Sequence, residues 1–176
     1  MHVCLDVGYF DEDRALAAAV CFETWEAARP CDQRVVPLDN VKPYVPGKFF
    51  ERELPCLLSV IRQITEPVET MIIDGQVRLT DSGAPGLGMY LYEALDKRVP
   101  IIGVAKSKYR HLNNAIEITR GDSNRALYVT AAGIPDEAAA ACIQQMHGVH
   151  RIPTLLKLVD QLSRGPEPFS QENLVD

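Results

Sequence analysis

The sequence lacks a long hydrophobic run, paired cysteines and an excess of positive charge, and each absence argues against a class of protein. No apolar run approaches the ~20 residues that span a bilayer, so we expect no membrane association. The five cysteines are odd in number and include no CxxC pair, which argues against a disulfide framework or a zinc cluster and favours buried thiols. The formal net charge of −6 argues against a protein that simply coats nucleic acid, because phosphate binding depends largely on Lys and Arg.

The N-terminus also lacks the features of a signal peptide. The stretch MHVCLDVGYF has no basic start, no long apolar region and no small-residue cleavage site, so we expect a cytoplasmic protein. A chain of 176 residues is typically one domain with one core. We predict a single domain over residues 1–165, a polar tail over 166–176 and a monomer.

The stretch 70–91 contains the most informative pattern in the chain. Residues 71–73 are uniformly apolar, which is typical of a strand covered on both faces, and the run ends in Asp74. Open α/β sheets bind ligands beyond the carboxyl ends of their strands, which is where this carboxylate is expected. Glycines at 75, 83, 86 and 88 then indicate a sharply turning loop before a helix from Leu87. The glycine spacing matches neither GxGxxG nor GxxxxGK[ST], so it predicts no dinucleotide or P-loop site.

The first forty residues favour three strands. Residues 2–8 are rich in β formers, 33–38 form another strand, and 14–25 are apolar enough for a strand or a short helix. The short acidic turn before residue 14 favours the strand, because two segments joined this way most simply form a hairpin. Asp6 is unusual inside a strand; it is either a strand-end residue bonded to a turn or part of a site.

Residues 41–55 combine prolines with exposed apolar side chains. Pro43, Pro46 and Gly47 hold Tyr44 in an extended or turning segment, which acts either as a lid over the core or as a contact for a ligand. We predict that a helix begins at Pro55, with Glu51 and Glu53 just before it or in its opening turn. For Glu51 we favour a simple interaction with the helix dipole.

The second half alternates strands and helices. The helix 87–95 followed by the strand PIIGVAK indicates parallel neighbouring strands, so Lys106 should lie at the same sheet edge as Asp74. Residues 114–120 and 125–131 predict two further strands, and Pro135 and Pro153 begin two helices. Asp160 lies at the border of the last apolar stripe, so periodicity alone leaves it undecided between solvent and a site.

Four segments together resemble the endonuclease V family of metal-dependent nucleases, which cut nucleic acid near deaminated purines. They are LDVGYF at 5–10, PYVPGKFFERELP at 43–55, IIDGQ at 72–76 with IIGVAKSKY at 101–109, and HRIPTLLKLVDQL at 150–162. The resemblance covers almost the whole chain in the correct order. It implies an α/β, ribonuclease H-like mixed sheet, in which antiparallel hairpin strands are extended by parallel strands and helices cover both faces.

The resemblance also implies an activity and a set of site residues. Asp6, Glu53, Asp74 and Asp160 match the acids that hold Mg²⁺, for which Mn²⁺ substitutes, and Lys106 matches the lysine that assists catalysis. The expected reaction is hydrolysis of a phosphodiester bond in DNA or RNA near an inosine-like base. Tyr44 and its flanking prolines match a wedge that supports the displaced base. The predicted substrate-binding residues are Tyr44, Pro46, Gly47, Gly75, Gln76, Gly86 and Arg151.

The chain departs from the family pattern after Asp74. Val77 replaces a second glycine, and Thr80, Asp81 and Ser82 stand where His-Pro-Arg is expected. The sequence also begins almost directly at the first predicted strand, so we expect no N-terminal helical extension. The alternative function is a nucleic-acid- or nucleotide-binding module that keeps the fold without the chemistry. A third hypothesis treats the acids as surface residues that do not gather.

Overall fold

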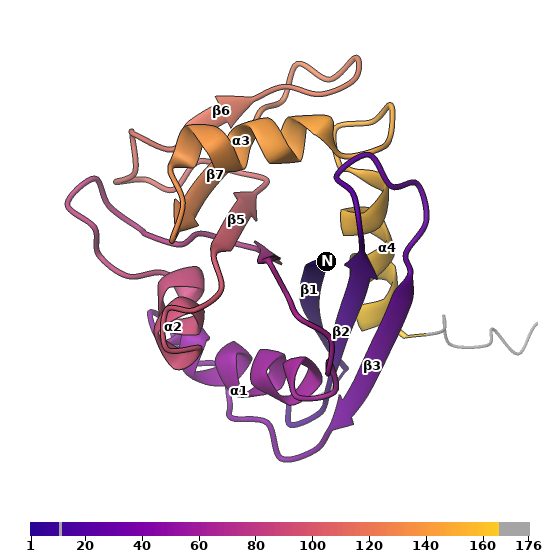
Figure 1. Cartoon of the computed structure of the whole chain (residues 1–176). Helices are drawn as coiled ribbons and strands as arrows, with labels where there is room; N and C mark the ends of the chain where they lie inside the picture. The colour runs from indigo at the N-terminus through magenta and orange to yellow at the C-terminus, as the bar shows by residue number, and fades with distance from the viewer. Residues whose placement is uncertain (11, 166–176) are drawn as a thin grey trace, which may run out of the picture.

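A computed structural model describes residues 1–10 and 12–165, whose strands form one mixed sheet with helices on both faces (Figure 1). Asp11 and the predicted tail 166–176 lie outside the described residues. In chain order the described elements are β1 (His2–Tyr9), β2 (Ala15–Phe22), β3 (Asp32–Leu38), α1 (Phe49–Ile61), β4 (Thr70–Asp74), α2 (Leu87–Ala94), β5 (Ile101–Ala105), β6 (Ile116–Ile118), β7 (Leu127–Ala132), α3 (Asp136–Gln145) and α4 (Thr154–Ser163).

The sheet has the strand order β3-β2-β1-β4-β5-β7-β6. The β1–β2 and β2–β3 pairs are antiparallel, as the predicted hairpin requires, whereas β1, β4 and β5 are parallel neighbours. The β5–β7 and β6–β7 pairs are again antiparallel. This order, with helices packed on each face, confirms the predicted ribonuclease H-like fold class.

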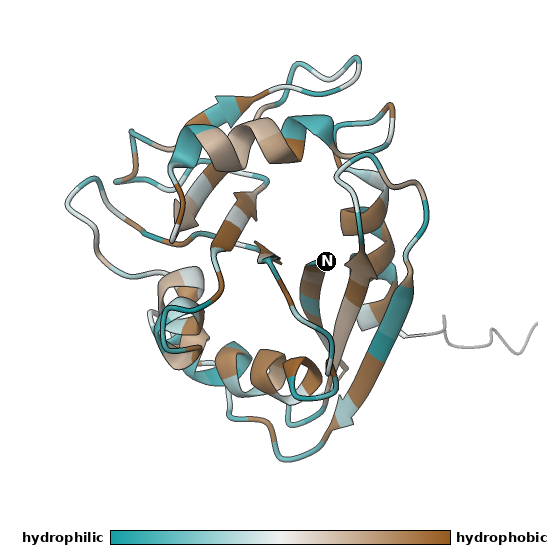
Figure 2. Cartoon of the chain, viewed as in Figure 1, coloured by the Kyte–Doolittle hydropathy of each residue, from teal (hydrophilic) through white to brown (hydrophobic). Residues whose placement is uncertain are grey.

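Two apolar cores lie on opposite faces of the sheet, because successive side chains of a strand point to opposite faces and contribute to one core or the other. The hydrophobic segments of the strands and helices are brown in Figure 2. On β1, Val3, Leu5 and Val7 pack on the face covered by α1 and α2, while Cys4 packs on the face covered by α3 and α4. Asp6 has the same parity as Cys4. Its side chain therefore belongs to the α3/α4 face, because successive side chains alternate across a strand.

The start of α1 differs from the prediction. The helix begins at Phe49 rather than at Pro55, which lies inside it and removes only one helical hydrogen bond. A turn closed by the Lys48 amide on the Val45 carbonyl directs the chain into the helix. Phe50 then stacks on Tyr90 of α2, with ring centroids 3.8 Å apart, and anchors the first turn. These contacts outweigh the helix-breaking tendency of one proline.

The cysteines and the apolar character of the helices can also be compared with the sequence-based predictions. Cys4, Cys21 and Cys56 are buried, but Cys31 is exposed and Cys142 is half-buried, so the prediction of buried thiols is wrong for the last two. Among the described residues, no helix combines the length and the apolar character needed to cross a membrane.

Candidate metal centre

The sheet register brings two predicted acids together at one edge. Leu5 of β1 pairs with Ile73 of the parallel strand β4, so the next residues, Asp6 and Asp74, are neighbours. Asp74 in turn pairs with Val104 of β5, and Lys106 follows two residues later at the same edge. The sequence predicted this edge, because the carboxyl ends of parallel strands point the same way.

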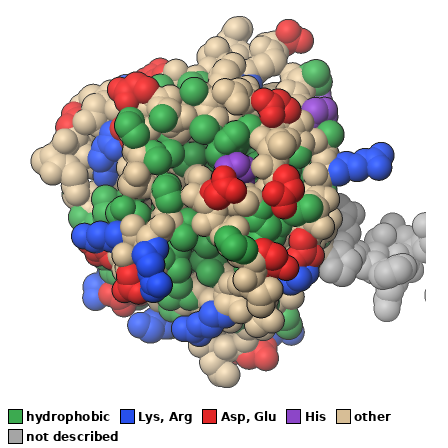
Figure 3. Space-filling model, viewed as in Figure 1, with side chains coloured by type: hydrophobic (Ala, Val, Ile, Leu, Met, Phe, Trp, Pro, Cys, Tyr) green, Lys and Arg blue, Asp and Glu red, His purple; other side chains and the backbone are tan. Residues whose placement is uncertain are grey.

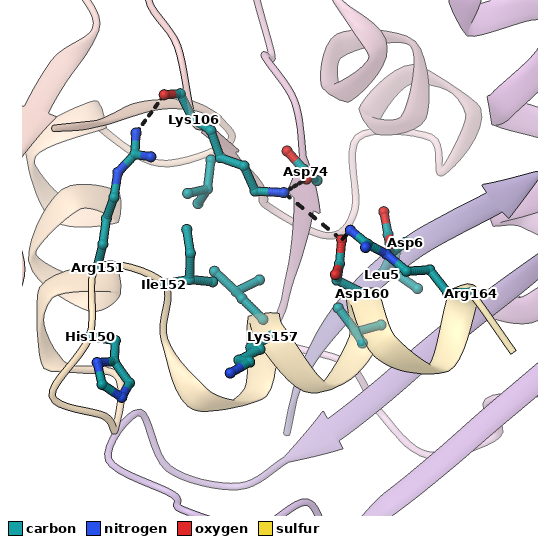
Figure 4. Close-up of a pocket in the computed structure, with 13 residues that line it drawn as sticks. Leu5, Asp6, Asp74, Lys106, His150, Arg151, Ile152, Lys157, Asp160 and Arg164 are labelled. Carbon is teal, nitrogen blue, oxygen red and sulfur yellow. Dashed lines mark hydrogen bonds and ion pairs between the residues drawn. The ribbon is translucent and has the colours of Figure 1, made fainter. Parts of the chain in front are cut away.

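Asp160 reaches this edge from α4, and two cations neutralise part of the acidic charge (Figure 4). The Lys106 ammonium lies 2.5 Å from Asp74 Oδ2 and 4.0 Å from Asp160 Oδ1, so it bridges the two carboxylates. Partial burial lowers the pKa of Lys106, but Asp74 and Asp160 outweigh this effect and raise it overall. Arg164 also pairs with Asp160 at 2.8 Å, one helical turn away. The i, i+4 spacing was a signal for this pair that sequence reasoning missed.

Asp6 is held by a hydroxyl that the sequence analysis also missed. Ser163 Oγ lies 2.6 Å from Asp6 Oδ2, and it comes from the last turn of α4, three residues after Asp160. Burial raises the pKa of Asp6, the bond from Ser163 opposes that rise, and the nearby charges of Asp74 and Asp160 add to it. The spacing of Ser163 from Asp160 was the available signal, because residues three apart share a helix face.

Glu53 approaches the same edge from α1, on the other face of the sheet. Its side chain is only 5% exposed, and its Oε2 atom has no hydrogen-bond partner. Burial raises the pKa of Glu53 well above its ordinary value, and the charges of Asp6 and Asp74 raise it further. The neighbouring Arg52 does not relieve this charge, because its guanidinium stacks 4.0 Å from the centre of the Tyr9 ring. A buried carboxylate without a partner is costly unless a cation approaches it.

The donor chemistry of this cluster fits a hard divalent ion such as Mg²⁺, which prefers carboxylate oxygens. Burial is the main cause that raises the pKa values of Asp6 and Glu53, and the neighbouring acids add to it, so a bound cation would stabilise the ionised forms of both and would give the unpartnered Glu53 oxygen a partner. Across residues 1–10 and 12–165, however, no three His, Cys, Asp or Glu side chains converge closely enough to hold an ion between them. The Lys106 amine lies between Asp74 and Asp160, where it contacts both carboxylates.

A cavity of about 330 Å³ opens beside Asp74 and is lined by five of the seven predicted substrate-binding residues. These are Tyr44, Gly47, Gly75, Gln76 and Gly86. Pro46 lies next to them in the turn before α1, and Tyr44 is 58% exposed. Sequence reasoning missed four further aromatic residues that line this cavity, Phe49, Phe50, Tyr90 and Tyr109. The adjacent phenylalanines after Gly47 were the available signal, since aromatic faces stack readily on nucleobases.

Arg151, the remaining member of the predicted substrate-binding set, is bonded to the backbone. Its guanidinium donates to the carbonyls of Lys106 and Ala126 at 2.5 and 2.6 Å. It also lines the cavity of about 390 Å³ between β5 and α4 that contains Asp6, Asp74 and Asp160. Arg151 therefore fixes the chain at Lys106, and its contact with substrate stays a prediction.

The loop 77–85, which departs from the family pattern, is anchored at Arg78 and at Asp81. Asp81 accepts hydrogen bonds from the backbone amides of Asn113 and Asn114 and from the Asn113 side chain. These bonds lower the pKa of Asp81. Arg78 forms an ion pair with Asp136 at the start of α3. Asp81, one of the altered residues, and Arg78 thus hold this loop against the segment 113–114 and the start of α3.

The strand order and the carboxylates at its edge define a ribonuclease H-like α/β protein with an acidic centre. A family model described as endonuclease V matches residues 2–153, and the chain belongs to this family. Acidic side chains, basic side chains and apolar patches are interspersed on the face seen in Figure 3, without a broad basic surface there.

Relatives and solved structures agree with this membership. An endonuclease V of Xylella fastidiosa is 33% identical over 103 residues, which cover 58% of this chain and 42% of that relative. One from Thermococcus kodakarensis is 28% identical over 167 residues, which cover 94% and 79%. The chain thus matches less than half the length of the Xylella protein.

Two crystal structures share the fold. Endonuclease V from Streptomyces avermitilis has a TM-score of 0.74 at 23% identity, covering 92% of this chain and 78% of that one. The Ciona intestinalis protein, in complex with a DNA containing an inosine followed by a ribo-adenosine, has a TM-score of 0.77 at 17% identity, covering 93% and 83%. At these identities the likeness establishes the fold alone.

Proposed function

We propose that this protein is a divalent-metal-dependent endonuclease that hydrolyses a phosphodiester bond in DNA or RNA near an inosine-like base. The observation that carries the proposal is the meeting of Asp6, Asp74 and Asp160 at one sheet edge, with Glu53 behind them. Acids separated by up to 154 positions share this edge although their charges repel. A cation bound among these carboxylates would offset their mutual repulsion.

The candidate ligands for Mg²⁺ or Mn²⁺ are Asp6, Glu53, Asp74 and Asp160. A bound ion would supply positive charge for the phosphate and acidify a water molecule. It would also offset part of the net negative charge of the protein.

The chain's own residues have separate tasks in this proposal. Lys106, which pairs with Asp74, would also contact a phosphate oxygen and stabilise the negative charge that develops there. Arg151 fixes the Lys106 backbone so that the amine starts from a defined place. The aromatic cavity beside Asp74 receives a base next to the phosphate, where Tyr44 and Phe49 offer ring faces for stacking.

The choice of an inosine-like base rests on family membership and on the inosine-containing DNA bound by the Ciona relative. The altered loop 77–85 borders the aromatic cavity through Leu79 and Pro85.

Cleavage of inosine-containing single-stranded DNA and RNA tests the proposal. We expect the wild type to cut with Mg²⁺ or Mn²⁺, Asp74→Asn to be inactive and Lys106→Met to lose activity by about 10²-fold. Asp39→Asn, an exposed aspartate at the end of β3, is the matched control and should retain activity. If the wild type cuts none of these substrates with either ion, or if Asp74→Asn cuts as well as the wild type, the endonuclease proposal is wrong.

A second candidate is a binding module that keeps the fold without hydrolysis. The ion pairs of Lys106 with Asp74 and of Arg164 with Asp160 favour it, because they neutralise two of the acids internally. Thermal unfolding distinguishes the candidates. A metal site predicts a rise in melting temperature with Mn²⁺ that Asp6→Ala abolishes, whereas a module that uses these ion pairs instead predicts no response.

A further inference from the structure

Ser163 joins two of the candidate ligands through one buried hydroxyl. Its side chain is 1% exposed, and its oxygen lies 2.6 Å from Asp6 Oδ2 and 2.9 Å from the backbone carbonyl of Asp160. Asp6 belongs to the first strand and Asp160 to the last described helix. The hydroxyl therefore links α4 directly to β1, through two residues that are 157 positions apart in the sequence.

A serine hydroxyl donates one hydrogen and accepts others, so it cannot donate to both neighbours at once. The ionised Asp6 carboxylate is the stronger acceptor, and a hydrogen bond to it is worth about twice one between neutral groups. The Asp160 carbonyl is an alternative acceptor of the kind that serines inside helices often use. With the hydroxyl directed at Asp6, Oδ2 is held in place, and the Val7 backbone amide also interacts with this carboxylate.

Gly8 shows how closely the helix that carries Ser163 approaches β1. A Cβ atom at Gly8 would lie 2.1 Å from the Ser163 carbonyl oxygen, so a larger residue there would force α4 away from the strand. The backbone contact fixes the distance between the two elements, and the hydroxyl fixes the direction of the carboxylate between them. No comparable side-chain hydrogen bond to Asp74 or Glu53 from a neutral group is present in the described residues.

We propose that Ser163 is a positioning residue that orients Asp6 toward a divalent ion and couples it to the helix of Asp160. The inference rests on the metal centre of the proposed function, and it concerns only this chain's own residues. Outer-shell partners of metal ligands typically contribute 10- to 100-fold to metal affinity, because they hold each ligand in the orientation that binds. A serine that merely satisfies the Asp160 carbonyl would contribute nothing of this kind.

Direct Mn²⁺ binding, followed by electron paramagnetic resonance of the free ion, tests the inference without relying on activity. We expect Ser163→Ala to weaken Mn²⁺ binding about tenfold or more. Ser163→Thr, which retains the hydroxyl, should bind at least several-fold more tightly than Ser163→Ala. Ser59→Ala, the same change on α1 away from the site, is the matched control and should bind like the wild type.

A double-mutant cycle separates positioning from general destabilisation. In Asp6→Asn, removal of the Ser163 hydroxyl should change Mn²⁺ affinity by less than about threefold, because its effect acts through the Asp6 carboxylate. Thermal unfolding in chelator identifies the temperature at which every variant is folded. If Ser163→Ala is too unstable, the comparison of Ser163→Thr with Ser163→Cys, a weak donor, makes the same test.

The outcomes distinguish this inference from the proposed function. Equal Mn²⁺ affinity in the wild type and Ser163→Ala overturns the positioning role and leaves the metal centre intact. Equal losses in Ser163→Ala and Ser163→Thr also overturn it, because they indicate a packing effect. Absence of Asp6-dependent Mn²⁺ binding in the wild type itself overturns the metal centre and the inference together.

Discussion

At the scale of single residues, His2 links the packing of the sheet to pH. Its ring is 8% exposed and stacks on Trp25, with centroids 4.3 Å apart. Burial lowers the pKa of His2 below its ordinary value of 6.5, although Glu69 opposes the effect. Between the folded and unfolded pKa values, the unfolded chain binds a proton that the folded chain does not. The free energy of unfolding therefore decreases as the pH falls below about 6.5.

We expect His2→Phe to remove this contribution, since phenylalanine keeps the ring contact with Trp25 without a titrating nitrogen. The slope of unfolding free energy against pH should fall by up to about 1.4 kcal/mol per pH unit, the value for one proton. Urea unfolding at intervals from pH 4.5 to about 7.5 in chelator measures it. Parallel slopes in the wild type and His2→Phe would contradict the assignment.

The local sequence pattern predicts the position of some candidate site residues but not of others. Asp74 and Lys106 end two apolar runs joined by one helix, so local pattern alone placed them at one sheet edge. Asp160 remained undecided from periodicity because its side chain lies at the border of the buried stripe. Ser163 was missed altogether, because its meaning depends on a contact with the other end of the chain.

At the scale of elements, Arg120 holds together the connection between α3 and α4. Its side chain is 5% exposed and donates to the carbonyls of Met146, Gly148 and His150. Burial lowers the pKa of this guanidinium, with no acidic partner to oppose it. The segment that it binds leads directly into the helix of Asp160. Arg120 thereby positions the helix that contributes the last acid.

We expect Arg120→Met to lower the free energy of unfolding by about 2–4 kcal/mol, because three carbonyls lose a charged donor. Denaturation by urea in chelator measures the change. Arg125→Met, which changes an exposed arginine just before β7, controls for the loss of one positive charge. A loss below about 0.5 kcal/mol in Arg120→Met would mean that water replaces the guanidinium at all three carbonyls.

Element prediction succeeded where one local pattern dominates and failed where distant contacts intervene. The hairpin of β1 and β2 and the β4-α2-β5 unit follow from alternation and uniform apolar runs. The start of α1 was misplaced because the Phe50–Tyr90 stack, between residues forty positions apart, decides it. Local propensity gave weight to Pro55, and tertiary packing overrode it.

At the scale of the whole molecule, charge opposes the proposed partner. Eighteen Lys and Arg residues against 24 Asp and Glu residues give the net charge of −6, whereas nucleic acid is a polyanion. We expect binding of an inosine-containing oligonucleotide to be at least about tenfold tighter with Ca²⁺ than in chelator, because the ion offsets the acids. Fluorescence anisotropy measures the affinity, and NaCl at matched ionic strength is the control. Equal affinities in Ca²⁺ and in chelator would show that the acids do not govern binding.

The contact between Gly8 and Ser163 joins the first described strand to the last described helix, which leaves the ribosome long after it. Until that helix emerges, a nascent chain carries Asp6 without the hydroxyl that orients it and without Asp160. The carboxylates of Asp6 and Asp160 therefore cannot meet before α4 has been synthesised. Co-translational folding of β1 and β4 alone would leave this acidic cluster incomplete.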